Sequence, residues 1–158
     1  MAAPRVALFN GEGSDVSRFP ELLELWDFPF EAVREKQLKN LTPESFDLLC
    51  LPPGYYQFNK SFNEAITHFV TDGGGCVGAC CGAWNITCRM SLIPCTYNRI
   101  FMEGKVLLHP QKCDHPILRD HVKRADGDFE DWEWLPMTHI NGALFIPEDQ
   151  DAVLATFD

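Results

Sequence analysis

Residues 73–84, Gly-Gly-Gly-Cys-Val-Gly-Ala-Cys-Cys-Gly-Ala-Trp, place three cysteines and five glycines within twelve positions. A cysteine sulfur can act as a nucleophile, bind a metal ion or be oxidised. The stretch contains two overlapping Gly-x-Cys-x-Gly frames, one centred on Cys76 and the other on Cys80. The chemistry that this stretch can do therefore depends on which of the two cysteines the fold presents.

A nucleophile elbow needs a strand before the nucleophile, a tight turn at it and a helix after it. Cys80 meets these conditions, because an apolar strand is expected over 76–79 and a helix is expected from Gly82. Cys76 would follow three glycines, which make a poor strand. We therefore predict that Cys80 is the nucleophile, with its thiolate favoured by the start of the helix. The backbone amides of Cys81 and Gly54 are candidate donors to an oxyanion.

Other interpretations of the cysteines are weaker, although a structural turn with buried sulfurs stays open. Cys76 and Cys80 have a spacing that zinc sites allow, but Cys88, Cys95 and Cys113 form no second compact pair. The glycines in the turn after the first predicted strand also lack the third glycine of a dinucleotide-binding fingerprint. We expect neither a metal site nor a bound cofactor.

Composition restricts the partners. The chain has 158 residues and a formal net charge of -10, which disfavours nucleic acid and anionic membrane surfaces. A small molecule is the expected ligand, and self-association into a homo-oligomer stays open. Seven cysteines without a visible signal peptide or membrane span predict a reduced, cytoplasmic chain. The length suits one domain spanning 1–158.

Apolar runs alternate with amphipathic segments along the first half of the chain. The predicted strands are 5–9, 30–34, 46–51 and 76–79, and the predicted helices have apolar stripes over 19–26 and 62–70. This alternation predicts a flavodoxin-like three-layer α/β sandwich with a mainly parallel central sheet. Further strands are expected at 105–109, 138–140, 143–146 and 152–155, the last three forming a meander.

Ligands of such folds bind beyond the carboxyl ends of the strands. Three glycine-bearing turns are predicted at that edge, and they come from three separate strands. They are Asn10–Ser14, Pro52–Gly54 and Cys80–Gly82.

Five stretches of the sequence, in this order, resemble the class I glutamine amidotransferase-like superfamily. Within that superfamily the sequence is most similar to the biotin-protein ligase N-terminal-domain-like family. The stretches are Val6–Ser14, Leu51–Gly54, Gly74–Ala83 and, more weakly, 115–117 together with 140–145. The resemblance implies a nucleophilic Cys80 in a pocket lined by the turns around Gly54 and Glu12, with Asn10 and Gly11 binding substrate. It also implies that the Glu12 carboxylate can contact Cys80, unless Glu12 is simply a solvated turn residue.

The sequence departs from the glutaminases of this superfamily at the catalytic base. Those enzymes have a His-x-Glu pair on a late strand, and no such triplet occurs here. His139 is the candidate base because it lies near the end of a predicted strand; His109 and His115 are the alternatives. We therefore expect a cysteine-dependent hydrolase or amidotransferase-like protein that acts on a small polar substrate. A non-catalytic binding module and a cysteine redox sensor are the alternative functions.

Overall fold

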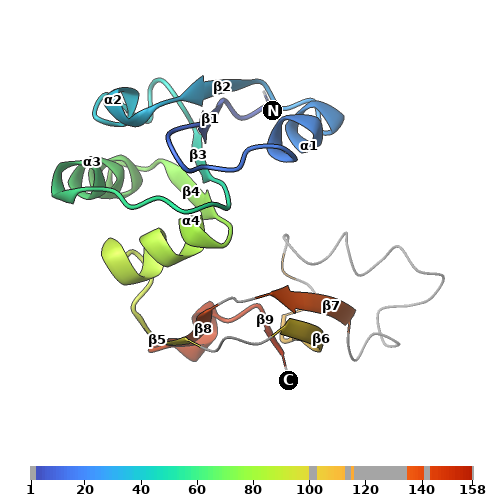
Figure 1. The fold of residues 1–158 in the computed structure, drawn as a ribbon. Helices are drawn as coiled ribbons and strands as arrows, with labels where there is room; N and C mark the ends of the chain where they lie inside the picture. Colours follow the sequence, from blue (N-terminus) through green and yellow to red (C-terminus); the bar gives the residue numbers. More distant parts are fainter. Residues whose placement is uncertain (1–2, 100–102, 113–114, 116–134, 141–142, 158) are drawn as a thin grey trace. The chain divides into compact units, whose positions relative to one another are not determined.

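The computed structural model describes residues 3–99, 103–112, 115, 135–140 and 143–157. The chain divides into two compact units, Met1–Ile93 and Pro94–Asp158, which are described separately (Figure 1). The expectation of one domain spanning 1–158 stays a prediction.

A parallel four-stranded sheet forms the centre of the first unit. Its strands are β1 (Val6–Phe9), β2 (Phe30–Val33), β3 (Leu48–Leu51) and β4 (Gly75–Gly78), in the order β2-β1-β3-β4. Every neighbouring pair is parallel. The fold class predicted from the alternating apolar runs is therefore confirmed, and each strand begins within two residues of its expected position.

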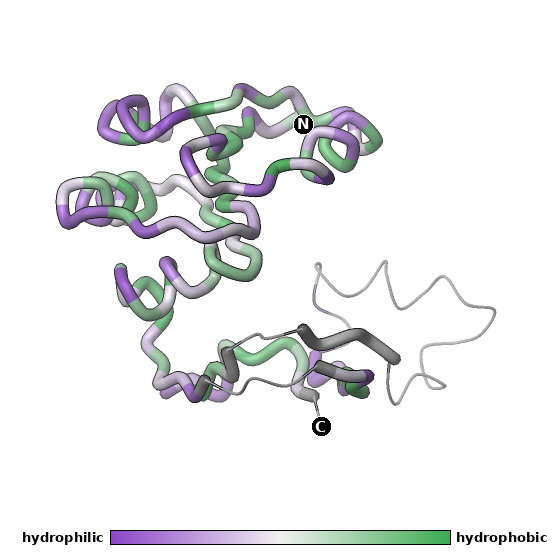
Figure 2. The backbone as a smooth tube through the Cα atoms, viewed as in Figure 1, coloured by the Kyte–Doolittle hydropathy of each residue, from purple (hydrophilic) through white to green (hydrophobic). Residues whose placement is uncertain are grey.

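Helices cover both faces of this sheet. They are α1 (Phe19–Leu25), α2 (Glu35–Leu38) and α3 (Lys60–Thr71). Successive strand side chains point to opposite faces, so β1 contributes Phe9 to the core that contains Ile66 of α3, and Leu8 to the core that contains Leu23 of α1. Figure 2 shows that hydrophobic residues follow β1 and β3 through the middle of the unit. β1 is buried along its whole length, which explains why its sequence is a continuous apolar run without polar alternation.

The longest helix among the described residues is α3, and local sequence signals account for both of its ends. The Asn59 side chain caps it by accepting a hydrogen bond from the amide of Phe62 at 3.1 Å. Ile66 and Phe69 are its buried residues, three positions apart on one face. The helix ends before Gly73, whose φ of 110° suits glycine. The chain then turns directly into β4.

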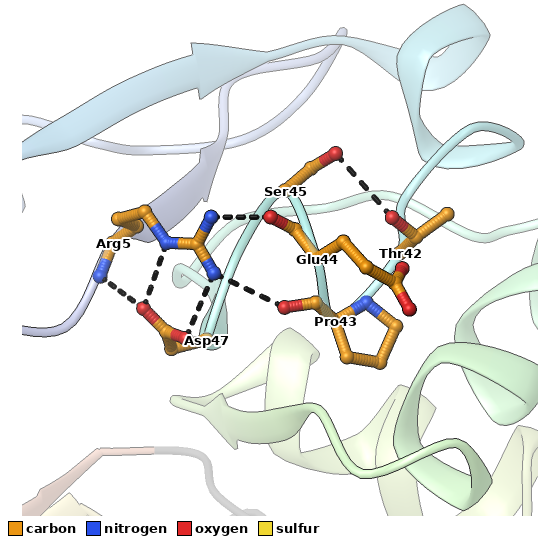
Figure 3. Close-up of polar contacts among 6 residues, drawn as sticks. All are labelled: Arg5, Thr42, Pro43, Glu44, Ser45 and Asp47. Carbon is orange, nitrogen blue, oxygen red and sulfur yellow. Dashed lines mark hydrogen bonds and ion pairs between the residues drawn. The ribbon is translucent and has the colours of Figure 1, made fainter.

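Arg5 joins the start of β1 to the loop before β3 (Figure 3). Its Nη2 lies 3.0 Å from Oδ1 of Asp47, and its Nε donates to Oδ2 of the same carboxylate at 3.1 Å. The guanidinium also donates to the carbonyl oxygens of Pro43 and Glu44. The hydrogen bonds that Arg5 donates to the Asp47 carboxylate lower its pKa to about 2. The Arg5 network thus fixes the amino ends of two neighbouring strands.

Antiparallel sheets make up the described part of the second unit. β5 (Cys95–Arg99) pairs with β8 (Ala143–Pro147), while β6 (Glu103–Pro110) pairs with β7 (Leu135–Ile140) and with β9 (Ala155–Phe157). The expected meander is wrong, because β8 pairs with β5 instead of with β7 or β9. No helix in the described part of the chain combines the length and apolarity needed to cross a bilayer.

The strand expected at 152–155 is also displaced toward the carboxyl end. Residues Gln150–Ala152 form a 3₁₀ turn, which the Asp149 side chain caps by accepting from the amide of Asp151 at 2.9 Å. The cap competes with extended structure, so the strand begins only at Ala155.

Candidate functional site

Cys80 lies in a sharp turn between a strand and a helix. β4 ends at Gly78, and α4 (Cys81–Trp84) begins directly after Cys80 and continues into a π-helical turn, Asn85–Arg89. Cys80 has φ 53° and ψ -113° and is exposed. Residues other than glycine rarely adopt such backbone angles, and strained angles of this kind concentrate at functional sites. The sequence stretch singled out for chemistry therefore contains a strained, accessible cysteine.

The glycines on either side of Cys80 permit this turn by allowing close backbone contact. A Cβ atom on Gly78 would lie 2.5 Å from the carbonyl carbon of Gly82 and 2.6 Å from the Ile86 side chain. A Cβ atom on Gly82 would overlap the carbonyl oxygen of Leu51. In the Gly-x-Cys-x-Gly frame centred on Cys80, both positions therefore require glycine for steric reasons.

Cys76, the centre of the other frame, has a different environment. It is half-buried in β4 and packs against the core, and burial raises the pKa of its thiol to about 12. Burial also raises the pKa of Cys50 in β3 to about 11. Both thiols stay protonated near neutral pH, and a protonated thiol is a poor nucleophile.

The turns after β1 and β3 meet each other. The amide of Tyr55 donates to the carbonyl of Gly13, and the amide of Asp15 donates to that of Pro53, each at 2.8 Å. Gly54 has φ 142°, and a Cβ atom there would overlap the carbonyl oxygen of Gly13. The expected meeting of the turns 10–14 and 52–54 is therefore present, with glycine where the two backbones approach.

Tyr56 joins the third turn to the second. The Cys81 thiol donates to the carbonyl of Tyr56 at 3.0 Å, and Nδ2 of Asn85 donates to the same oxygen at 3.3 Å. The Tyr56 hydroxyl donates to the carbonyl of Pro52 at 2.7 Å. Burial raises the pKa of Tyr56, and the neighbouring Cys81 adds to this effect. The three turns predicted to converge are thus joined by hydrogen bonds.

The amides proposed as oxyanion donors lie in these turns. Within the described part of the chain, neither the amide of Cys81 nor the amide of Gly54 donates a hydrogen bond to another group. For Cys81 this agrees with its place at the first position of α4, where the amides have no partner inside the helix. Burial raises the pKa of the Cys81 thiol, so its contribution to the site comes from the backbone and from the bond to Tyr56.

The turn after β1 positions Glu12, Asn10 and Gly11. The amide of Glu12 donates to Oε1 of Glu35 at 3.0 Å, and the amide of Asn10 donates to the carbonyl of Val33 at 2.8 Å. The carbonyl of Gly11 accepts from Oγ of Ser14 at 2.7 Å. Within the described residues, no hydrogen bond joins Glu12 to Cys80. The roles of these three residues toward a substrate stay proposals.

A cavity of about 360 Å³ lies beside these turns. Its lining includes both carboxylates, Glu12 and Glu35, together with Tyr55 and Tyr56. Cys80 is not among its lining residues. A separate cavity of about 510 Å³ lies against β2 and α2 and contains none of the predicted site residues.

The candidate bases belong to the second unit, whereas Cys80 belongs to the first. His139 lies in β7 of the second unit, where the backbone alone is described, while His109 lies in β6 and His115 in the turn that follows. In residues 3–93, all of which are described, His68 on α3 is the one histidine, and it lines a hollow with Cys88. No group of His, Cys, Asp and Glu side chains that could hold a metal ion occurs among the described residues.

Three residues that sequence reasoning missed connect the site. Glu35 holds the first turn, Tyr56 joins the second and third turns, and Asn85 lies fully buried behind Cys81. The sequence could have indicated the role of Asn85, because an asparagine four residues after Cys81 lies on the same face of the helix as Cys81. The roles of Glu35 and Tyr56 depend on contacts between distant segments, which no local pattern reveals.

Solved structures share this fold. PurLQS from Thermotoga maritima matches with a TM-score of 0.69 and 18% identity over 99% of this chain and 75% of that one. A glutamine amidotransferase from the same organism matches with a TM-score of 0.61 and 17% identity, covering 94% and 65%. The chain has a glutamine amidotransferase-like fold. A glutamine amidotransferase from Methylobacillus flagellatus gives a TM-score of 0.56 and 17% identity, covering 92% and 58%.

No family model and no curated protein matches the sequence. The glutamine amidotransferase-like fold agrees with the fold that the sequence resemblance implies, while membership of that superfamily stays a proposal. These identities describe the fold alone, and similarity to the biotin-protein ligase family stays a proposal.

Proposed function

We propose that this chain is a cysteine-dependent hydrolase or amidotransferase-like enzyme in which Cys80 attacks the carbonyl carbon of a small polar substrate. The observation that supports this most is the exposed Cys80 at φ 53°, between a strand and a helix. This arrangement supports the proposal that Cys80 occupies a nucleophile elbow.

The chemistry follows from the groups around the turn. The Cys80 thiolate adds to the carbonyl carbon, and the carbonyl oxygen becomes an oxyanion. The amides of Cys81 and Gly54 would donate hydrogen bonds to it. The intermediate then collapses with loss of the leaving group, which leaves an acyl thioester on Cys80 that water hydrolyses.

The solved structures of similar fold suggest the substrate class. Two of them are named glutamine amidotransferases, so a primary amide is the first substrate to test. Loss of ammonia from an amide requires a proton donor. His139 is our candidate for that donor, and Glu12 is our candidate for a group that assists Cys80. A single domain, a cytoplasmic location, a small-molecule ligand and membership of the biotin-protein ligase-like family form part of the same proposal.

An acylation experiment tests this function. The protein is mixed with p-nitrophenyl acetate, p-nitrophenolate release is followed by absorbance, and the acetylated cysteine is located by peptide mass spectrometry. We expect a thioester at Cys80 and loss of the rapid release in Cys80→Ala. Equal release by the wild type and Cys80→Ala would refute a nucleophilic Cys80. Ammonia release from L-glutamine then tests whether the substrate is an amide.

A cysteine redox sensor is the second candidate, because the exposed Cys80 differs from Cys50 and Cys76, whose thiol pKa values burial raises to about 11 and about 12. Mild peroxide would convert the Cys80 thiolate to a sulfenic acid, the peroxide being reduced to water. Intact-mass and peptide analysis should then find one added oxygen at Cys80. Oxidation spread evenly over the cysteines would exclude a sensor.

A further inference from the structure

Asn85 is buried and uses its amide group to join two segments. Its side chain has no exposed area, and its Nδ2 donates to the carbonyl of Cys81 at 2.9 Å and to that of Tyr56 at 3.3 Å. The first bond lies within the helix that follows Cys80. The second reaches the segment that follows the turn at Gly54. Two neutral acceptors on separate segments are therefore held by one amide nitrogen.

Tyr56 extends this connection to the Pro-Pro-Gly turn. Its carbonyl accepts from Asn85 and from the Cys81 thiol, and its hydroxyl donates to the carbonyl of Pro52 at 2.7 Å. The path from Asn85 through Tyr56 to Pro52 thus ends two residues before Gly54. At its other end Asn85 donates to the carbonyl of Cys81, the residue whose amide is the other proposed oxyanion donor.

We propose that Asn85 is a positioning residue that sets the separation of the Cys81 and Gly54 amides through its bonds to the Cys81 and Tyr56 carbonyls. This inference rests on the proposed function, since it concerns how the oxyanion is held. Asn85 does not touch the substrate. Replacing its amide by an apolar side chain leaves the Cys80 sulfur in place. The Tyr56 carbonyl then keeps the bond from the Cys81 thiol but loses the bond from Asn85, so the two backbone segments are held less firmly.

Two reactions of Cys80 separate this role from general stability. Acylation by p-nitrophenyl acetate forms a bond from sulfur to the carbonyl carbon and passes through an oxyanion before p-nitrophenolate leaves. Alkylation by iodoacetamide forms a bond from sulfur to carbon as iodide leaves, and it involves no oxyanion. The ratio of the two rates therefore reports on oxyanion stabilisation and cancels changes in thiol exposure or thiolate fraction.

The experiment measures this ratio at Cys80 in the wild type, in Asn85→Leu and in Thr87→Val. Thr87 is a matched control, because it is buried in the same helical segment and its hydroxyl donates only locally, chiefly to the carbonyl of Ala83 at 2.8 Å. We expect the ratio to fall about tenfold or more in Asn85→Leu and to stay unchanged in Thr87→Val. A ratio that is unchanged in folded Asn85→Leu, or that falls equally in both variants, would overturn the proposal.

Tyr56→Phe keeps the test decisive if Asn85→Leu does not fold. It retains the ring and removes only the hydroxyl that holds Pro52, so we expect the same direction of change; an unchanged ratio would then overturn the inference. Failure of the proposed function has a different signature. In that case the wild type itself shows no acetylated Cys80, and it releases p-nitrophenolate no faster than Cys80→Ala does.

Discussion

Gly78 at the end of β4 packs directly against Gly82 in α4, with room for no Cβ atom between the two backbones. The two glycines flank Cys80, which alone takes the strained angles of the turn. The close contact of these two backbones thus places Cys80 in its exposed turn. The predictions for Gly82 and for Cys80 concern this arrangement.

The close contact at Gly82 predicts a large loss of stability on substitution. A methyl group there would overlap the Leu51 carbonyl, and overpacking of this kind costs about 1–3 kcal/mol. Chemical denaturation of Gly82→Ala should show that loss in the free energy of unfolding. Gly104→Ala is the control, because nothing lies within 4 Å of its added methyl group; a similar loss in both variants would contradict the steric explanation.

The strain at Cys80 predicts that glycine there stabilises the protein. Removing the side chain relieves a positive φ, and we expect Cys80→Gly to raise the free energy of unfolding by about 1 kcal/mol. Cys80→Ala keeps the Cβ atom and should change it by less than about 0.5 kcal/mol. The two variants lose the same thiol, so equal stabilities would show that the turn stores no strain.

Alkaline pH should destabilise the protein through Cys76. Its folded pKa of about 12 lies above the ordinary value of 9.0, so the unfolded chain loses this proton first. Stability is therefore full below about pH 8 and falls as the pH rises from about 9 toward 12, by up to about 1.4 kcal/mol per pH unit for one such thiol. Urea unfolding across this range should show a shallower fall in Cys76→Ala, and identical slopes would argue against a buried thiol.

Acid pH should remove the contribution of the Arg5 and Asp47 pair. The pKa of Asp47 is lowered from 3.8 to about 2, chiefly by its hydrogen bonds with Arg5. The stabilisation is therefore present above about pH 4 and is lost as the pH falls toward 2. The difference in thermal stability between the wild type and Asp47→Asn should shrink over that interval. A difference that is constant with pH would mean that the carboxylate charge contributes nothing.

The sequence was most informative where one local pattern determines one element. The apolar runs at β1 and β3 predicted the parallel sheet, because strands buried on both faces have no polar alternation. α2 was missed, since its four residues, Glu-Lys-Gln-Leu, give a single buried position at Leu38. The pairing of β8 with β5 was also missed, because pairing partners depend on the tertiary fold.

For the candidate site, the sequence predicted the turn at Cys80 from the glycine spacing together with the strand expected before Cys80 and the helix expected after it. It did not predict the path from Asn85 through Tyr56 to Pro52. That path joins residues up to 29 positions apart through backbone carbonyls, and the identity of a residue says nothing about where its carbonyl points. The role of His139 as the base for Cys80 also stays a proposal, because His139 lies in the second unit and Cys80 in the first.

Competitive alkylation of the seven cysteines tests the central claim most directly. The native protein is treated with limiting iodoacetamide at pH 7, quenched at intervals, unfolded and labelled with an isotopic form of the reagent, and the isotope ratio at each cysteine is read by peptide mass spectrometry. We predict that Cys80 reacts at least about tenfold faster than Cys50 and Cys76. Equal rates at the three thiols, or faster reaction at Cys76, would contradict the account.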